Sequence, residues 1–183
     1  MQKNHARVRT ICYQALIAAL YVALTFAVPM LSFGMMQLRL SEAMTVLPVL
    51  YPPATLGLTV GCALANLIGF FSGVNPIGLI DAPVGALATL LAGLCSAAVG
   101  RLIPAEKHPH RRVLLGLVFP VVFNGVIVGA ELTALFLESF WLNCFWVAAG
   151  EAVVCCVLGY PLGLGLQRSS IFRRLTHNQE KQE

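Results

Sequence analysis

Five acidic residues lie within or beside long segments that carry no other acid, and they are the side chains best placed to do chemistry. These acids are Glu42, Asp81, Glu131, Glu138 and Glu151. A charged side chain inside a bilayer costs about 2.5–3.5 kcal/mol even on the lenient insertion scales, so an acid there marks a functional site. Glu138 falls between two apolar segments, where we expect it to be solvated. The other four acids are candidates for binding a ligand.

Amide and aromatic side chains accompany these acids. Asn124 lies seven residues before Glu131, so the two side chains face the same side of a helix. Aromatic residues fall near the same level, where most of them would form an interfacial belt. A carboxylate can accept two adjacent N–H groups, and an aromatic ring can stack on the face of a ligand ring. Together these side chains predict a pocket for a small planar polar molecule.

Two of the candidates have a structural alternative. Arg39 and Glu42 are three residues apart, a spacing that lets them pair on one helix face. Such a pair could hold a loop to the helix bundle or contact a ligand. Asp81 comes early in an apolar segment, where a carboxylate also suits a helix N-terminus. Capping and ligand binding therefore both remain open for Asp81.

The sequence offers no catalytic arrangement. The four histidines lie in the tails or in a polar loop, away from these acids, and no Ser or Cys has a base within motif range. The six cysteines lack zinc-site spacing and are typical of apolar helix packing, and a phosphate-binding loop of the form G-x-x-x-x-G-K-[ST] is missing. We expect no enzymatic activity, no metal site, no cofactor and no nucleic-acid partner.

The composition identifies the elements that position these residues. The chain has 183 residues, of which 58% are hydrophobic and 11% charged. A typical soluble domain is about 45–50% apolar and about 25% charged. Residues 10–38 and 43–80 contain no charged side chain at all. Such runs are typical of membrane spans and exclude a soluble domain, so we predict an all-α polytopic membrane protein.

Six spans can be drawn, and the second is short. A helix over 40–50 would rise only about 16 Å, which makes it a half-span or a strongly tilted helix. The pair of prolines at 52–53 and the turn at 72–76 separate the second, third and fourth segments. The predicted spans are 10–28, 40–50, 54–71, 79–100, 113–137 and 142–166.

The distribution of basic residues predicts the orientation. With six spans, both tails lie on the same side as the loops 51–53 and 101–112, and that side holds all the basic residues except Arg39. The positive-inside rule then places both termini, residues 1–9 and 167–183, in the cytoplasm. We expect a single integral-membrane domain over 1–183, located in the plasma membrane of a prokaryote.

Small residues recur every four positions on the first span, at Ala15, Ala19 and Ala23. This spacing puts them on one helix face, where another backbone can approach closely. A similar stripe runs through Gly57 and Gly61 on the third span. Each stripe predicts either packing within the bundle or a docking face for another membrane subunit.

Eight short stretches of the chain resemble the QueT family, the queuosine-precursor S components of energy-coupling-factor (ECF) transporters. The resemblance extends over about residues 10–166, and the stretch around Arg39, Ser41 and Glu42 is its most specific part. The stretches are LSFG at 31–34, QLRLSEA at 37–43, TVLP at 45–48, GLTVGCALAN at 57–66, GALATLL at 85–91, NGVIVGAEL at 124–132, GE at 150–151 and LGYP at 158–161.

The resemblance implies a fold and a set of partners. S components have six helices, cytoplasmic termini and an outward-facing pocket covered by the loops after helices one, three and five. The resemblance implies that Ala15, Ala19 and Ala23 dock on a membrane coupling subunit, the T component. Two cytoplasmic ATPases would drive the complex, and the S component would topple in the membrane to release its substrate.

The same resemblance implies roles for the candidate site residues. The expected ligand is a 7-deazaguanine, such as a pre-queuosine base, queuine or queuosine. Its hydrogen-bonding edge or an amine would meet two acids, an amide would fix its orientation, and loop residues would close the pocket. The two acids would be Glu131 and Glu151, and the amide would be Asn124. Asn75 and Asp81 from loop three would close the pocket, and Arg39 and Glu42 would position loop one as the lid.

Three alternatives remain. An S component for another vitamin, such as a flavin or biotin, would leave two of the acids without a role. A small membrane enzyme or a stand-alone proton-coupled carrier would be built on Glu131 and Glu151. An integral scaffold without transport activity would have no use for polar residues at this depth.

Overall fold

A computed structural model gives the architecture, and it describes residues 2–34 and 37–170. Every regular element within those ranges is helical, which confirms the all-helical prediction. The elements are α1 (Gln2–Ala27), α2 (Pro29–Ser32), the 3₁₀ helix η1 (Leu40–Val46), α3 (Leu47–Leu50), α4 (Ala54–Phe71), α5 (Gly78–Leu102), α6 (Pro109–Phe136), α7 (Phe140–Val154), the π-helix η2 (Cys155–Gly159) and α8 (Tyr160–Arg168).

Five helices in the described ranges are long and apolar enough to cross a membrane. They are Arg7–Ala27, Ala54–Phe71, Gly78–Leu102, Pro109–Phe136 and Phe140–Arg168, the last of which joins α7, η2 and α8. The second predicted span, 40–50, corresponds to the shorter apolar helix Leu40–Leu50. A full span needs about 20 residues, so this segment covers only part of the bilayer.

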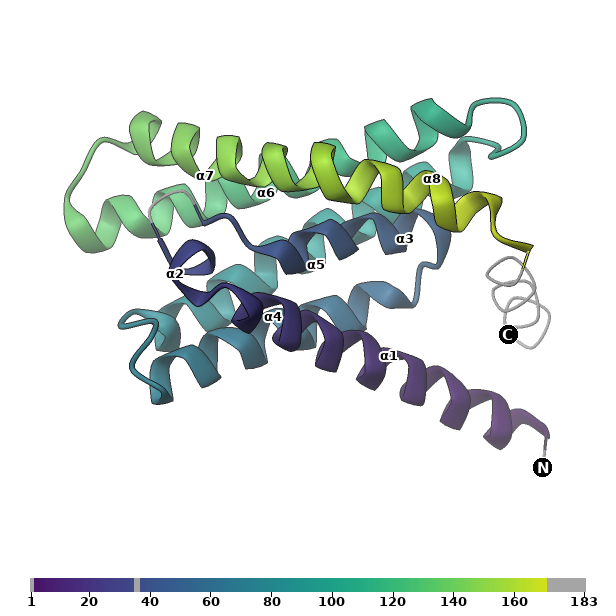
Figure 1. Cartoon of the computed structure of the whole chain (residues 1–183), viewed down its shortest axis with the longest axis horizontal. Coiled ribbons are helices and arrows are strands. Elements are labelled where there is room, and N and C mark those ends of the chain that lie inside the picture. The colour runs from purple at the N-terminus through teal and green to yellow at the C-terminus, as the bar shows by residue number, and fades with distance from the viewer. Residues whose placement is uncertain (1, 35–36, 171–183) are drawn as a thin grey trace.

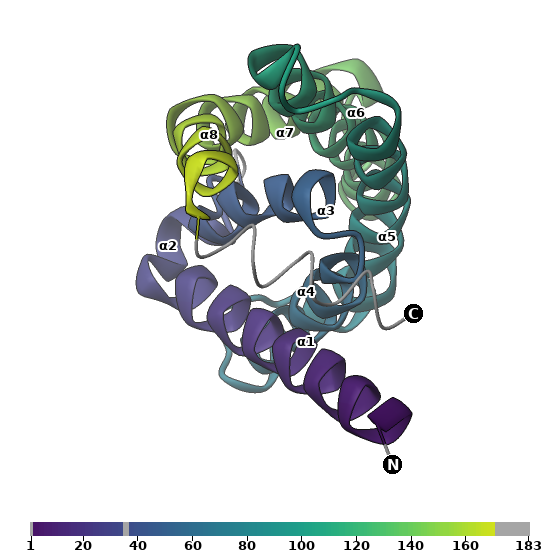
Figure 2. The ribbon, with the colours of Figure 1, turned by 90° about the vertical axis from the view of Figure 1, so that its right-hand side faces the viewer.

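The short segment occupies the middle of the bundle. Viewed along the helices, α3 lies inside a ring formed by the longer helices (Figure 2). Successive long helices pack against each other around this ring: α1 with α4, α4 with α5, α5 with α6 and α6 with α7. The side chains of residues 41–46 are all buried, and η1 contacts both α1 and η2. The long helices therefore shield a short helix that lipid could not accommodate.

The two ends of the bundle differ in what they carry. The N-terminal end of α1 and the C-terminal end of α8 lie at the same end (Figure 1). The opposite end, which we call the distal end, carries α2 and the loops 72–77 and 137–139. Because α1 starts and α8 finishes at the same end, the chain passes along the bundle an even number of times, with the short segment counted as one pass.

Two of the small-residue stripes prove to face in different directions. Gly57 and Gly61 are buried against α1, where an added Cβ would lie 2.8 Å from the carbonyl oxygen of Gln14 and from the Cβ of Tyr21, respectively. Ala15, Ala19 and Ala23 are exposed on the other side of α1. The α4 stripe thus packs within the bundle, whereas the α1 stripe remains uncovered in the isolated chain.

Two irregular helical segments face each other in the core. The seven-residue η1 is long for a 3₁₀ helix, and η2 interrupts the last long helix with wider π-type turns. They contact each other directly. Each is associated with one of the predicted site acids: η1 contains Glu42, and Glu151 lies one turn before η2. Mid-helix 3₁₀ and π segments are frequent at functional sites.

Candidate functional site

Arg39 is the centre of a buried polar network at the distal end of the bundle. Its Nη2 donates to Oδ1 of Asn66 on α4 at 3.0 Å, and its Nε donates to the carbonyl oxygen of Ser32 at 3.0 Å. The guanidinium also lies 5.3 Å from the centroid of the Phe33 ring. The side chain of Arg39 therefore ties the C-terminal end of α2 to the C-terminal half of α4.

Asp81 is the ionic partner of Arg39. Its Oδ2 lies 3.8 Å from Nη2 of Arg39 and accepts a hydrogen bond from Nδ2 of Asn75 at 2.6 Å. Asn66 donates from Nδ2 to the carbonyl oxygen of Asp81 at 3.3 Å. The side chain of Asp81 does not cap α5, because that helix begins after Ile77 without a side-chain cap. The carboxylate of Asp81 instead joins α5 to the segments that carry Arg39 and Asn75.

Glu42 has a different partner from the one its spacing to Arg39 suggested. Its Oε1 accepts a hydrogen bond from the hydroxyl of Tyr21 on α1. Beside it, the hydroxyls of Thr25 and Ser41 are hydrogen-bonded at 2.8 Å. The second carboxylate oxygen of Glu42 is buried without a hydrogen-bond partner. The three-residue spacing is not used because Arg39 turns toward Asp81, on the far side of the network.

Glu131 and Asn124 on α6 are buried and incompletely satisfied. Both carboxylate oxygens of Glu131 and the amide nitrogen of Asn124 lack a hydrogen-bond partner. Glu131 lies near enough to Asp81 and Arg39 to interact with their charges. Buried polar atoms of native proteins are nearly always hydrogen-bonded, so Glu131 and Asn124 are candidates for binding a polar ligand.

Glu151 lies deeper in the same region, next to Glu42. The two carboxyl groups interact with each other, and the thiol of Cys155 approaches Oε1 of Glu151 at 3.6 Å. Thr45 in turn contacts the sulfur of Cys155 at 3.8 Å. Among the described residues, no group of three or more His, Cys, Asp or Glu side chains is arranged to hold a metal ion.

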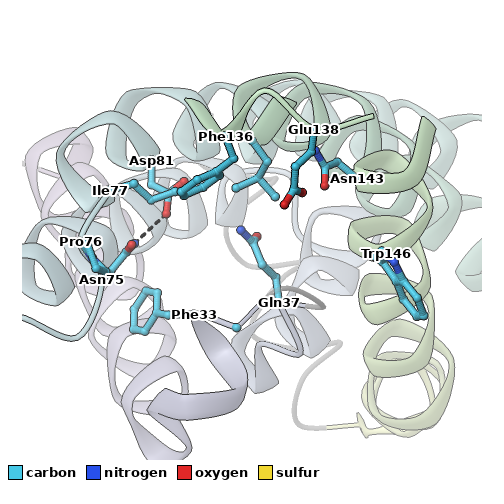
Figure 3. A pocket seen from close by; sticks show the side chains of 12 residues that line it. Phe33, Gln37, Asn75, Pro76, Ile77, Asp81, Phe136, Glu138, Asn143 and Trp146 are labelled. Atoms are coloured by element: carbon cyan, nitrogen blue, oxygen red, sulfur yellow. Dashed lines mark hydrogen bonds between the residues drawn. The ribbon is translucent and has the colours of Figure 1, made fainter. Parts of the chain in front are cut away.

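A cavity of about 340 Å³ opens at the distal end of the bundle (Figure 3). This volume falls within the range of about 300–1,000 Å³ that is usual for small-ligand sites. The lining combines aromatic, amide and acidic side chains. It consists of Phe33, Gly34, Gln37, Asn75, Pro76, Ile77, Asp81, Leu132, Phe136, Glu138, Asn143 and Trp146.

The predicted site residues divide into two groups in the structure. Asn75 and Asp81 line the cavity, and Arg39 contacts Asp81 without being part of the lining itself. Glu131 comes directly before the lining residue Leu132. The remaining predicted residues lie outside the lining, in the buried network or on α6; they are Glu42, Asn124 and Glu151.

Several functional candidates were not predicted from the sequence. Glu138 is exposed as expected, but it also lines the cavity. Asn66 was not predicted as a site residue, yet it links Arg39 with Asp81. Gln37 and Asn143 were not predicted either, because a single amide near the start of a helix is common and has no distinctive spacing.

The comparisons with known proteins agree in part with this picture. The family model described as QueT transporter matches residues 11–168, which is most of the chain. No curated protein and no solved structure matches the chain.

Proposed function

Because the chain belongs to the QueT transporter family, we propose that it is the substrate-binding S component of an ECF-type importer for queuosine precursors. Membership in this family makes it a multi-pass membrane transport protein, in keeping with its five apolar helices. Its cargo would be a 7-deazaguanine, such as a pre-queuosine base, queuine or queuosine. The protein would bind the cargo without changing it chemically.

The observation that carries the proposal is the cavity at the distal end. It offers Phe33 and Phe136 as apolar ring surfaces and Asp81 as a hydrogen-bond acceptor. Asp81 is fixed in place by Arg39 and Asn75, so it is preorganised for a ligand rather than free to turn away. A planar heterocycle with adjacent N–H groups suits such a site.

We assign the buried acids to the polar edge of the ligand. Glu131 and Glu151 would accept N–H groups of the 7-deazaguanine or of an attached amine, and Asn124 would fix its orientation. Both oxygens of Glu131 are buried without a partner, which supports its part of this assignment. Glu42 and Arg39 would hold the segment that precedes η1 in place over the ligand.

The proposed orientation puts the distal end outside the cell. The loop at the other end, between α5 and α6, carries Lys107, and Arg101 and Arg112 flank it. Basic residues of this kind favour the cytoplasmic side. With the short segment counted as a sixth pass, both termini would be cytoplasmic and the cavity would face the external medium, as an importer requires.

The partners would be a membrane T component and two cytoplasmic ATPases. The exposed face of Ala15, Ala19 and Ala23 is the proposed contact with the T component, because small side chains allow close helix approach. Energy for release of the cargo would come from the ATPases.

Ligand-induced stabilisation of the detergent-purified chain tests the proposal. A ligand at a hundredfold excess over its Kd stabilises the folded protein by about 2.7 kcal/mol. The panel would hold pre-queuosine bases, queuine, queuosine, guanine, biotin and riboflavin. We expect a rise in the unfolding midpoint only with 7-deazaguanines. A rise with biotin or riboflavin alone would assign a different vitamin.

The buried acids also support a second candidate function, a proton-coupled carrier. Glu42 and Glu151 interact with each other in the core, and carboxyl groups in that situation can share a proton. Proteoliposomes separate the two functions. A carrier would accumulate cargo under a proton gradient without ATP or partners, whereas an S component alone would bind its cargo without transporting it.

A further inference from the structure

We propose that Gln37, Glu138 and Asn143 form a second polar subsite in the cavity, which binds a cationic amine carried on a side arm of the ligand. The planar ring of the same ligand would lie against Asp81 at the other side. This inference rests on the proposed function and narrows its cargo to ligands with an amine substituent.

The cavity has two polar sides with apolar side chains between them (Figure 3). Asp81 and Asn75 lie on one side and are hydrogen-bonded to each other. Glu138 and Asn143 lie on the other side, and the side chains of Gln37 and Glu138 point toward each other across the space between them. A ligand that fills the cavity therefore meets one polar group at each side.

The two acids of the lining differ in their charge balance. Asp81 is neutralised by Arg39 at 3.8 Å. Glu138 forms no ion pair within the described part of the chain, and no basic side chain is among the residues that line the cavity. The carboxylate of Glu138 is exposed and lines the cavity together with Phe136 and Leu132, so its charge is available to a cationic group that enters the cavity. The ligand is the natural source of that cation.

The amides beside Glu138 present acceptors for an ammonium group. Nδ2 of Asn143 donates to Oγ1 of Thr133 at 3.2 Å, which leaves the amide oxygen of Asn143 as an acceptor. An ammonium group has three donors and no acceptor. The lining offers three acceptors for those donors, namely the carboxylate of Glu138, the amide oxygen of Asn143 and the amide oxygen of Gln37.

The backbone holds this subsite in shape. Gln37 has φ 43° and Leu137, directly before Glu138, has φ 57°; they are the only positive-φ residues other than glycine in the described chain. Leu137 ends α6, and its N–H donates to the carbonyl oxygen of Thr133 at 3.0 Å. Left-handed conformations are unfavourable for such residues and cluster at ligand sites. Both positions set the direction of a polar side chain that lines the cavity.

A pair of ligands that share one ring tests the inference. The probes are 7-deazaguanine and 7-aminomethyl-7-deazaguanine, and the measurement is the Kd of each for the purified full chain and for Glu138→Gln. Loss of one charge-assisted contact is worth about tenfold in Kd. We expect Glu138→Gln to weaken the aminomethyl compound by about tenfold and to leave the bare ring within about twofold.

The matched control is Glu106→Gln, an exposed acid in the loop at the other end of the bundle. It should change neither Kd. Equal weakening of both ligands by Glu138→Gln, or no change for either, would overturn the amine subsite while leaving the proposed function intact. If neither ligand bound the unmodified chain, the proposed function itself would fail, and the subsite with it. Retained binding of the bare ring shows that the variant is folded.

Discussion

The guanidinium of Arg39 lies 3.8 Å from the carboxylate of Asp81, and Asn66 is hydrogen-bonded to both residues. These three side chains come from the segment before η1, from α4 and from α5. They are almost completely buried. The network therefore fixes the wall of the cavity and joins three parts of the fold, so its loss should affect both stability and binding.

Removing the charge of Arg39 should destabilise the protein strongly. Arg39→Met leaves Asp81 buried without its cation, and breaking a buried pair on one side typically costs about 3–5 kcal/mol. The midpoint of thermal unfolding in detergent should fall accordingly. Arg101→Met, at an exposed position, is the control and should leave the midpoint nearly unchanged.

A double variant separates lost charge pairing from lost packing. Arg39→Met combined with Asp81→Leu removes both charges, and replacing a buried pair with apolar side chains is often close to neutral. We expect the double variant to regain part of the stability lost in Arg39→Met. If the two effects simply added, the ion pair would not be the main stabilising interaction at this position.

Removing the hydroxyl of Tyr21 should weaken the core around η1. Tyr21→Phe takes away the donor to Glu42, whose other carboxylate oxygen is already without a partner. Leaving a buried acceptor unsatisfied costs about 1–3 kcal/mol, and more for a charged group. Unfolding of Tyr21→Phe should therefore occur at a lower temperature. Tyr13→Phe, at a half-buried position on the same helix, provides the comparison.

A second change at Glu42 tests whether the effect of Tyr21→Phe passes through the carboxylate. Glu42→Gln removes the charge that the hydroxyl solvates. Once that charge is gone, the loss of the hydroxyl should cost less than it does in the unmodified protein. An equal cost in both backgrounds would mean that Tyr21 acts through packing alone.

Glu131→Gln should abolish ligand binding without loss of stability. The carboxyl group of Glu131 lies beside Asp81, and Gln is nearly the same size as Glu and can donate a hydrogen bond to the carboxylate of Asp81. The unfolding midpoint should therefore stay close to that of the unmodified protein. Glu151→Gln should also abolish binding. Titration of both variants with a 7-deazaguanine checks this, and wild-type Kd values in both would remove these acids from the site.

Much of the fold could be predicted because the sequence marks its boundaries locally. Charge-free runs and the proline pair at 52–53 set the helix limits, so the short helix was expected at 40–50 and is observed at Leu40–Leu50. Helix α1 extends further toward the N-terminus than predicted, because no Gly or Pro interrupts residues 2–9. The π-type turns of η2 have no such marker in the sequence, and in the structure η2 packs against η1, which is distant along the chain.

The partners within the site could not be predicted in the same way. The hydrogen bond between Arg39 and Asn66 joins residues 27 positions apart, and neither residue type specifies the other. The three-residue spacing favoured Glu42 as the partner of Arg39, because a sequence pattern indicates only neighbours on the same helix. Glu138 was expected to be solvated for a related reason. Its loop lies at the surface, but the left-handed turn at Leu137 precedes a side chain that enters the cavity wall.

The opposite faces of α1 allow folding and partner docking to be separated by mutation. Ala19 is exposed, whereas Gly61 of α4 is buried against Ala18 and Tyr21 of α1. Ala19→Leu should therefore leave ligand binding and thermal stability intact but prevent co-purification with the T component, because a larger side chain keeps the two helices apart. Gly61→Leu should instead lower the unfolding midpoint, since its side chain has no space between α1 and α4. Unchanged co-purification of Ala19→Leu, with the ATPases present, would show that this face of α1 is not the docking surface.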